Sequence, residues 1–406
     1  MTVHSLDPRL VRDAPGWSGL WEGFRRRLRQ GELGSLPVVL GLIAVWAYFQ
    51  LSNSNFLSSG NLTNLMLQIA ATGTIAVGVV LVLLLGEIDL SVGAVSGLAG
   101  AVMAVLNVQH GVNAELAIVA GLAAGAGVGL IHGLWVTKFR VPSFVVTLAG
   151  LLAWQGALLF VLGDTGTVNV TDHGITRLAG TFYSSGVSWT VATIAVGAYV
   201  MFVLVDRQRR DKAGLLVPSM VSVAVRLAVV AGGVIAATAV FVADRGLPLA
   251  VVIFVGLIGV FDVVTKRTRF GRHIFAVGGN VEAARRSGIK VERVRLAVFV
   301  LASTMAAAGG ILAASRLLAV NQSSGSGDVL LIAIASAVIG GTSLFGGRGT
   351  AWSALLGALV IGSIANGMDL LGKSSEVKFM VTGAALLVAA TIDAVARRGR
   401  QAAGRA

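Results

Sequence analysis

Residues 63–85, TNLMLQIAATGTIAVGVVLVLLL, form an apolar run without a single charged side chain. A run of about 20 such residues is long enough to cross the hydrocarbon core of a bilayer as one helix. The next residues, GEIDLSVGAVSGL at 86–98, place two carboxylates directly before a second apolar stretch. This part of the sequence therefore predicts two membrane helices joined by a short acidic turn.

Similar apolar runs recur along the whole chain. With the first they give about twelve candidate spans, at 35–52, 63–85, 90–107, 114–136, 142–163, 187–205, 220–243, 247–265, 294–316, 329–346, 350–370 and 377–394. The segments at 90–107 and 329–346 are short enough to be broken or re-entrant helices. Of the 406 residues only 13% are charged, against about 25% in a soluble protein. The sequence predicts an all-α polytopic integral membrane protein with about 10–12 transmembrane helices.

The basic residues are distributed unevenly between the loops. If the spans alternate, most of the 32 Lys and Arg residues lie on the side of the two termini. The opposite side then holds only Arg177, Arg245, Arg316, Lys373 and Lys378, and Arg226, at a helix end, stays unassigned. Cytoplasmic loops carry an excess of Lys and Arg, so we expect both termini to be cytoplasmic and the loop at 164–186 to lie outside. The net charge of +13 suits such loops. Nucleic acid is not expected as a partner, because no aromatic residues alternate with the basic clusters.

We expect three parts along the chain. Residues 1–34 form a basic cytoplasmic segment, residues 35–398 form a membrane domain, and residues 399–406 form a cytoplasmic tail. The largest cytoplasmic connection, at 266–295, contains GGNVEAARRSG, in which Asn280 can cap a short helix and Gly288 can end it. Glu282 lies in the first turn, where its charge complements the helix dipole. The alternative is a solvated amphipathic loop.

Four motifs, in family order, resemble those of ABC importer permeases. The connection at 266–295 is similar to their coupling loop through Gly278, Gly279, Asn280, Glu282, Ala283, Ala284, Arg285, Ser287, Gly288, Ile289 and Val291. The other three resemble the monosaccharide permeases for ribose, galactose, arabinose and xylose: LLLGEIDLSVGAVSGL at 83–98, VPSFVVTLAGLLAWQG at 141–156 and AVIGGTSLFGGRGT at 337–350. The resemblance covers about residues 36–398. It is greatest for the xylose branch, which shares the longer middle region and the DRGLP turn at 244–248.

The resemblance implies a type II-like permease subunit that imports a monosaccharide, xylose or a related sugar, by alternating access across the bacterial plasma membrane. It implies a homodimer, two cytoplasmic ATPase subunits and an extracytoplasmic sugar-binding protein. It also implies that Asn280, Glu282, Ala283, Ala284, Arg285 and Gly288 couple the chain to the ATPase. ATP hydrolysis is then expected on a separate subunit, with no cofactor or metal in this chain. The alternative is a secondary, ion-coupled solute transporter.

Two groups of polar residues are candidates for the transport path. Acids near spans are functional candidates. We interpret Glu87, Asp89, Ser91 and Gly93 as a helix cap and inner gate, with a proton or cation site as the alternative. A neutral sugar needs hydrogen-bonding groups that do not hold it tightly. Residues of that kind are Trp154, Gln155, Asn321, Gln322 and Asn366, which are equally consistent with bonds between helices.

Two further patterns have structural explanations. Gly121, Gly125, Gly129 and Gly133 repeat at helical spacing, which predicts a face for close packing of a second helix. Residues 367–374, GMDLLGKS, match the P-loop pattern but end an apolar helix instead of following a strand. We therefore do not expect this segment to bind a nucleotide.

Overall fold

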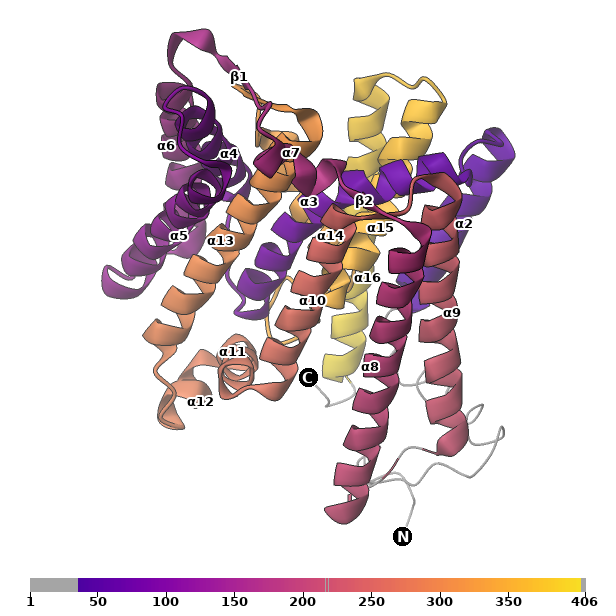
Figure 1. Ribbon diagram of the computed structural model, residues 1–406. Coiled ribbons are helices and arrows are strands. Elements are labelled where there is room, and N and C mark those ends of the chain that lie inside the picture. The colour runs from indigo at the N-terminus through magenta and orange to yellow at the C-terminus, as the bar shows by residue number, and fades with distance from the viewer. Residues whose placement is uncertain (1–35, 216, 218, 403–406) are drawn as a thin grey trace. The chain divides into compact units, whose positions relative to one another are not determined.

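The computed structural model describes residues 36–402 except 216 and 218 (Figure 1). The predicted segment at 1–34 and residues 403–406 of the predicted tail lie outside the described residues. The chain divides into a larger unit, Ser35–Phe182 with Pro248–Val395, and a smaller unit made of Tyr183–Leu247 and both chain ends. Each unit is considered by itself below.

The larger unit consists almost entirely of helices. Most are apolar: α2 Leu36–Ser52, α3 Ser59–Leu84, α4 Val92–Val108, α5 Ala114–Lys138, α6 Ser143–Leu162, α10 Leu249–Arg267, α13 Val291–Leu317, α14 Gly327–Ile339, α15 Trp352–Leu370 and α16 Ser375–Ala402, whose last residues belong to the smaller unit. Three shorter helices lie between them: α7 His173–Gly180, α11 Arg269–Gly279 and α12 Val281–Arg286. The smaller unit contributes α8 Ser185–Lys212 and α9 Met220–Asp244. Each of the twelve predicted spans falls on a helix.

Eight of the described helices are long and apolar enough to cross a membrane. The helices α2, α4 and α14 are apolar but shorter. Helix α14 ends at Ile339, several residues before the end of the predicted span, because residues 340–351 form a turn rich in glycine. The predicted shortness of 90–107 and 329–346 is therefore confirmed, and their re-entrant character stays a prediction.

Helix α13 lies at the centre of the larger unit, where it packs against α3, α4 and α5. The glycine face of α5 lies against it, as predicted. A Cβ on Gly129 would lie 2.5 Å from the carbonyl oxygen of Phe299, and one on Gly125 would lie 2.5 Å from the Cβ of Ala307. Because helices in lipid gain little from hydrophobic burial, such close backbone approach is a principal source of their packing energy.

The two ends of the larger unit differ in structure, as Figure 1 shows. One end carries α11 and α12. The other end carries α7 and an antiparallel pair formed by β1 Thr167–Asn169 and β4 Ala319–Asn321. We call them the α12 end and the α7 end.

A hydrogen bond closes the larger unit where the chain leaves it and returns. Between these points the chain runs through β2 Phe182–Tyr183, the helices of the smaller unit and β3 Leu247–Pro248, and the two strands are paired. The amide of Leu249 donates to the carbonyl oxygen of Thr181 at 3.0 Å. Both residues belong to the larger unit, so its two halves are joined at that point by backbone hydrogen bonding alone.

Candidate functional site

The short helix predicted after Asn280 is present at the α12 end, as α12 itself. Asn280 caps α12, and its side-chain oxygen accepts a hydrogen bond from the amide of Ala283 at 2.9 Å. Gly288 follows the helix with a φ of +81°, a left-handed conformation that favours glycine. Helix α11 was not predicted. Its buried residues Gly271, Ile274 and Val277 are spaced for one helical face, but they are few enough to resemble a loop.

The polar residues of α12 face outward. Arg285 pairs with Glu282 at 2.7 Å, and about half or more of each side chain is exposed. The sequence placed both alanines at a partner-facing surface. In the structure Ala284 is 3% exposed and belongs to the core, whereas Ala283 is exposed. A six-residue helix has room for only one buried face, and Ala284 lies on it.

At Gly278, helix α11 meets two distant turns through backbone atoms. The amide of Gly347 donates to the carbonyl oxygen of Leu84 at 2.9 Å. A Cβ on Gly278 would overlap that same oxygen, and a Cβ on Gly346 would lie 2.6 Å from the carbonyl oxygen of Gly278. We call this contact of Leu84–Gly86, Gly278 and Gly346–Gly347 the glycine junction. It brings three of the four predicted motifs together.

An ion pair lies beside the glycine junction. Glu87 accepts from Arg295 of α13 at 2.7 Å, and the two side chains are only 14% and 24% exposed. The Nε of Arg295 is buried and has no hydrogen-bond partner among the described residues. The sequence singled out Glu87 but not Arg295, because Arg295 is one of many basic residues in a basic connection. The pair connects the acidic turn to the helix that follows α12.

Asp89 stabilises the turn that leads into α4. Its Oδ1 accepts hydrogen bonds from the amide and the hydroxyl of Ser91, at 2.8 and 2.6 Å. The remaining motif, at 141–156, supports the same turn, because the hydroxyls of Ser143 and Thr147 accept hydrogen bonds from the amides of Ile88 and Leu90. Asp89 is 4% exposed, and its Oδ2 has no partner in the described part of the chain. All four motifs thus contribute to one structure at the α12 end.

Gly93 provides the surface on which another segment rests. A Cβ at this position would lie 2.7 Å from the carbonyl oxygen of Gly325, in the loop that precedes α14. The same loop passes so close to Gly97 that a Cβ there would overlap the carbonyl oxygen of Ser324. Helix α4 therefore holds the loop before α14 through its glycine face.

Trp154 is joined by a hydrogen bond to a histidine on a neighbouring helix. Its Nε1 donates to Nε2 of His132 on α5 at 2.9 Å, and Nδ1 of His132 lies 3.5 Å from the hydroxyl of Ser91. Since Nε2 accepts, the neutral ring carries its proton on Nδ1 and donates toward Ser91. Trp154 thus belongs to a chain of contacts that ends at Asp89. His132 was not predicted, because a single histidine within an apolar helix gives no signal.

The other path candidates separate into two places. Gln155 donates through Nε2 to the backbone oxygen of Gln322 at 3.0 Å, next to Asn321. Asn366 is instead paired with Asn61, and each side-chain amide donates to the other at 2.8 and 3.0 Å. Both amides are therefore occupied in joining α3 to α15. The hydrogen bonds of Asn366 fit the alternative explanation, a bond between helices. Gln155, Asn321 and Gln322 lie next to one another and form one polar group.

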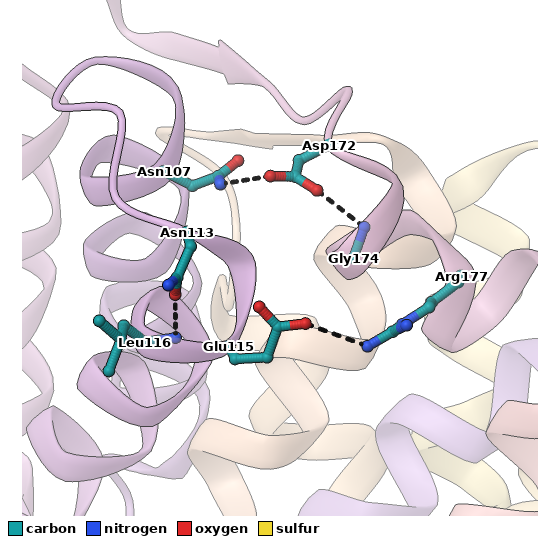
Figure 2. A network of polar contacts seen from close by, with 7 residues as sticks. All are labelled: Asn107, Asn113, Glu115, Leu116, Asp172, Gly174 and Arg177. Carbon is teal, nitrogen blue, oxygen red and sulfur yellow. Dashed lines mark hydrogen bonds and ion pairs between the residues drawn. The ribbon is translucent and has the colours of Figure 1, made fainter.

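Figure 2 shows a polar network at the α7 end. Asp172 caps α7, accepting from the amide of Gly174 at 2.7 Å and from the side chain of Asn107 at 2.8 Å. The hydrogen bond from Asn107, followed by that from Gly174, lowers the pKa of the Asp172 carboxyl. Glu115 and Arg177 form an exposed ion pair at 3.2 Å. These contacts fix α7 to α4 and α5.

Comparisons with known proteins agree with this arrangement. The family model described as branched-chain amino acid transport system / permease component matches residues 61–390. The chain is 37% identical to the xylose transport system permease protein XylH of Escherichia coli K12, over 97% of this chain and 98% of that one. It is 34% identical to XylH of Haemophilus influenzae, over 90% and 98%. It is 32% identical to the ribose import permease protein RbsC of Bacillus subtilis, over 89% and 94%. No solved structure matches the chain.

Proposed function

The chain belongs to the branched-chain amino acid and sugar permease family of ABC transporters, and we propose that it carries xylose or a related monosaccharide into the cell. Membership of this family itself shows that the chain is the multi-pass membrane subunit of a bacterial sugar ABC importer and that ATP hydrolysis belongs to a separate subunit. Membership also excludes the alternative of an ion-coupled secondary transporter. The sugar is proposed from the greater identity to the two xylose permeases.

The observation that carries the proposed mechanism is the contact between Gly278 and Leu84. Helix α12 exposes Glu282, Ala283 and Arg285, and we propose that this surface docks in the ATPase. A displacement of α12 is passed to α11. Since no side chain separates Gly278 of α11 from the carbonyl oxygen of Leu84, a movement of α11 is passed directly to the acidic turn. The turn at Glu87–Gly93 is then the inner gate.

Gln155, Asn321 and Gln322 are the proposed path residues. They form one polar group with exposed members, Gln322 and Asn321 among them. In the proposed homodimer, the same group from a second copy faces it across the path. Neutral amides offer a sugar both donors and acceptors without binding it tightly enough to trap it.

The proposed orientation follows from the charge distribution. Residues 266–295, at the α12 end, and both termini are cytoplasmic, and residues 35–398 form the membrane domain. The α7 end then faces the sugar-binding protein.

Proteoliposomes containing the chain, its ATPase and its binding protein test the function. We expect uptake of radiolabelled xylose that requires ATP and the binding protein, with competition from other pentoses measured in parallel. Omitting the binding protein is the matched control. Uptake of leucine instead of any sugar would show that the substrate class is wrong.

A further inference from the structure

Arg226 and Tyr199 form a pair within the smaller unit. The Nε of Arg226, on α9, donates to the phenol oxygen of Tyr199, on α8, at 2.7 Å. The guanidinium carbon lies 5.7 Å from the centroid of the tyrosine ring. The terminal amino groups of Arg226 have no partner among the described residues, and no described carboxylate lies within ion-pair distance. The charge is held in place without being neutralised.

The pair lies within the apolar parts of α8 and α9. Arg226 is the only charged residue of α9 before Asp244 and follows Met220 by six positions, which is about 9 Å along a helix. On α8 the first charged residue after Tyr199 is Asp206, about 10 Å further on. Helical side chains tilt toward the N-terminus of their helix. Arg226 therefore reaches back toward the nearer membrane surface.

The surroundings of the pair are apolar and open. Only 17% of the most apolar window of α8 and 11% of that of α9 are buried. Arg226 is exposed, and Val229, one turn further along α9, is 70% exposed. A cation on such a surface is costly in lipid unless it reaches water or a counter-ion at the headgroups. The open surface is apolar where a lipid chain would lie and cationic where a headgroup would lie.

We propose that Arg226 and Tyr199 bind the phosphate of an anionic phospholipid. The terminal amino groups of Arg226 form a planar fork that matches two phosphate oxygens. The phenol holds the fork in position, and the exposed face of α9 receives an acyl chain. Basic residues at the end of α8, Arg209 and Lys212 among them, add attraction for a negative headgroup. This proposal depends only on the membrane location and not on the transported substrate.

Lipid retention of the purified full-length chain tests the proposal. Wild type and Arg226→Gln are equilibrated with phosphatidylglycerol or phosphatidylethanolamine in detergent, and bound lipid is counted by native mass spectrometry. We expect the substitution to lower phosphatidylglycerol retention about fivefold and to leave phosphatidylethanolamine retention unchanged. Arg245→Gln, at the other end of α9 and paired with Asp244, is the matched control and should behave as wild type.

Further variants keep the test decisive. If Arg226→Gln does not insert, Tyr199→Phe removes only the phenol oxygen and should still weaken retention of phosphatidylglycerol. Equal phosphatidylglycerol retention by wild type and the variant overturns the proposal, as does an equal loss in Arg245→Gln or equal retention of the two lipids by wild type. A polypeptide that co-purifies with wild type but not with Arg226→Gln, while lipid retention is unchanged, would assign this face to a protein and overturn the proposal as well.

Discussion

The carbonyl oxygen of Leu84 occupies the space that a side chain on Gly278 would need. That oxygen also accepts the amide of Gly347, so it cannot move aside without breaking a hydrogen bond. At the glycine junction, helix α11, the end of α3 and the turn before α15 therefore meet through backbone atoms without a deformable side chain between them. Tight interiors transmit displacement instead of absorbing it.

Replacing Gly278 with alanine should uncouple transport from ATP hydrolysis. The added methyl group must push α11 away from Leu84, at a cost of about 1–3 kcal/mol. We expect ATP hydrolysis by the complex to continue while sugar uptake falls. Gly279→Ala is the control, because a Cβ on Gly279 meets no atom within 4 Å. Equal uptake by the two variants would show that the glycine junction does not transmit motion.

Breaking the pair of Glu87 and Arg295 should destabilise the protein. Arg295→Gln leaves a largely buried carboxylate without its cation, which we expect to cost roughly 2 kcal/mol, below the about 3–5 kcal/mol of a fully buried pair. Thermal unfolding in detergent measures the effect. The double variant Glu87→Gln with Arg295→Gln should recover part of the loss. Arg285→Gln breaks an exposed pair instead, and its melting temperature should be close to wild type.

The path and packing roles of the polar residues predict different phenotypes. If Gln155 lines the path as proposed, Gln155→Leu should lower sugar uptake with little change in stability, because its amide makes only an exposed hydrogen bond to the backbone of Gln322. Asn366→Ala should lower stability, by about 0.6 kcal/mol for each interhelical hydrogen bond lost, and leave uptake per folded molecule unchanged. Uptake and thermal unfolding of the same preparations separate the two effects. If the Asn366→Ala protein is as stable as wild type but takes up sugar more slowly, Asn366 lines the transport path.

Acid should release α7 only below about pH 4. The pKa of Asp172 is lowered in the folded protein, so its stabilising effect is fully present above the unfolded value of about 3.9. The effect is lost as the pH falls through the lower folded value. The difference in melting temperature between wild type and Asp172→Asn should be constant from pH 7 to 5 and shrink below 4. Glu115→Gln, which breaks an exposed pair, should change the melting temperature little.

Sidedness can be measured directly because the chain contains no cysteine. Ser287→Cys, after α12, should be protected from an impermeant maleimide in intact cells and become labelled after lysis. Thr171→Cys, before α7, should be labelled without lysis. Both positions are exposed. Labelling of Ser287→Cys in intact cells would reverse the proposed orientation.

The sequence was sufficient to predict the apolar helices but few of their contacts. The hydropathy of a segment depends only on residues that are neighbours in the sequence, so an apolar run such as 63–85 can be recognised as a span from the sequence alone. The glycine junction depends on three segments far apart in the chain, and nothing local distinguishes Gly278, which is enclosed, from Gly279, which is open. For the same reason the sequence could not show the partner of Trp154, because His132 lies on another helix. Arg226, the one basic residue that the charge pattern left unassigned, became interpretable only beside Tyr199.

The hydrogen bond between Thr181 and Leu249 has a consequence for how this protein tolerates changes in length. Everything between these residues, including α8 and α9, is an insertion that departs from and returns to one point of the larger unit. Its two helices are each long and apolar enough to cross a membrane, so excising both should preserve the orientation of every later span. Gain or loss of such a hairpin is therefore a single step that leaves the glycine junction untouched.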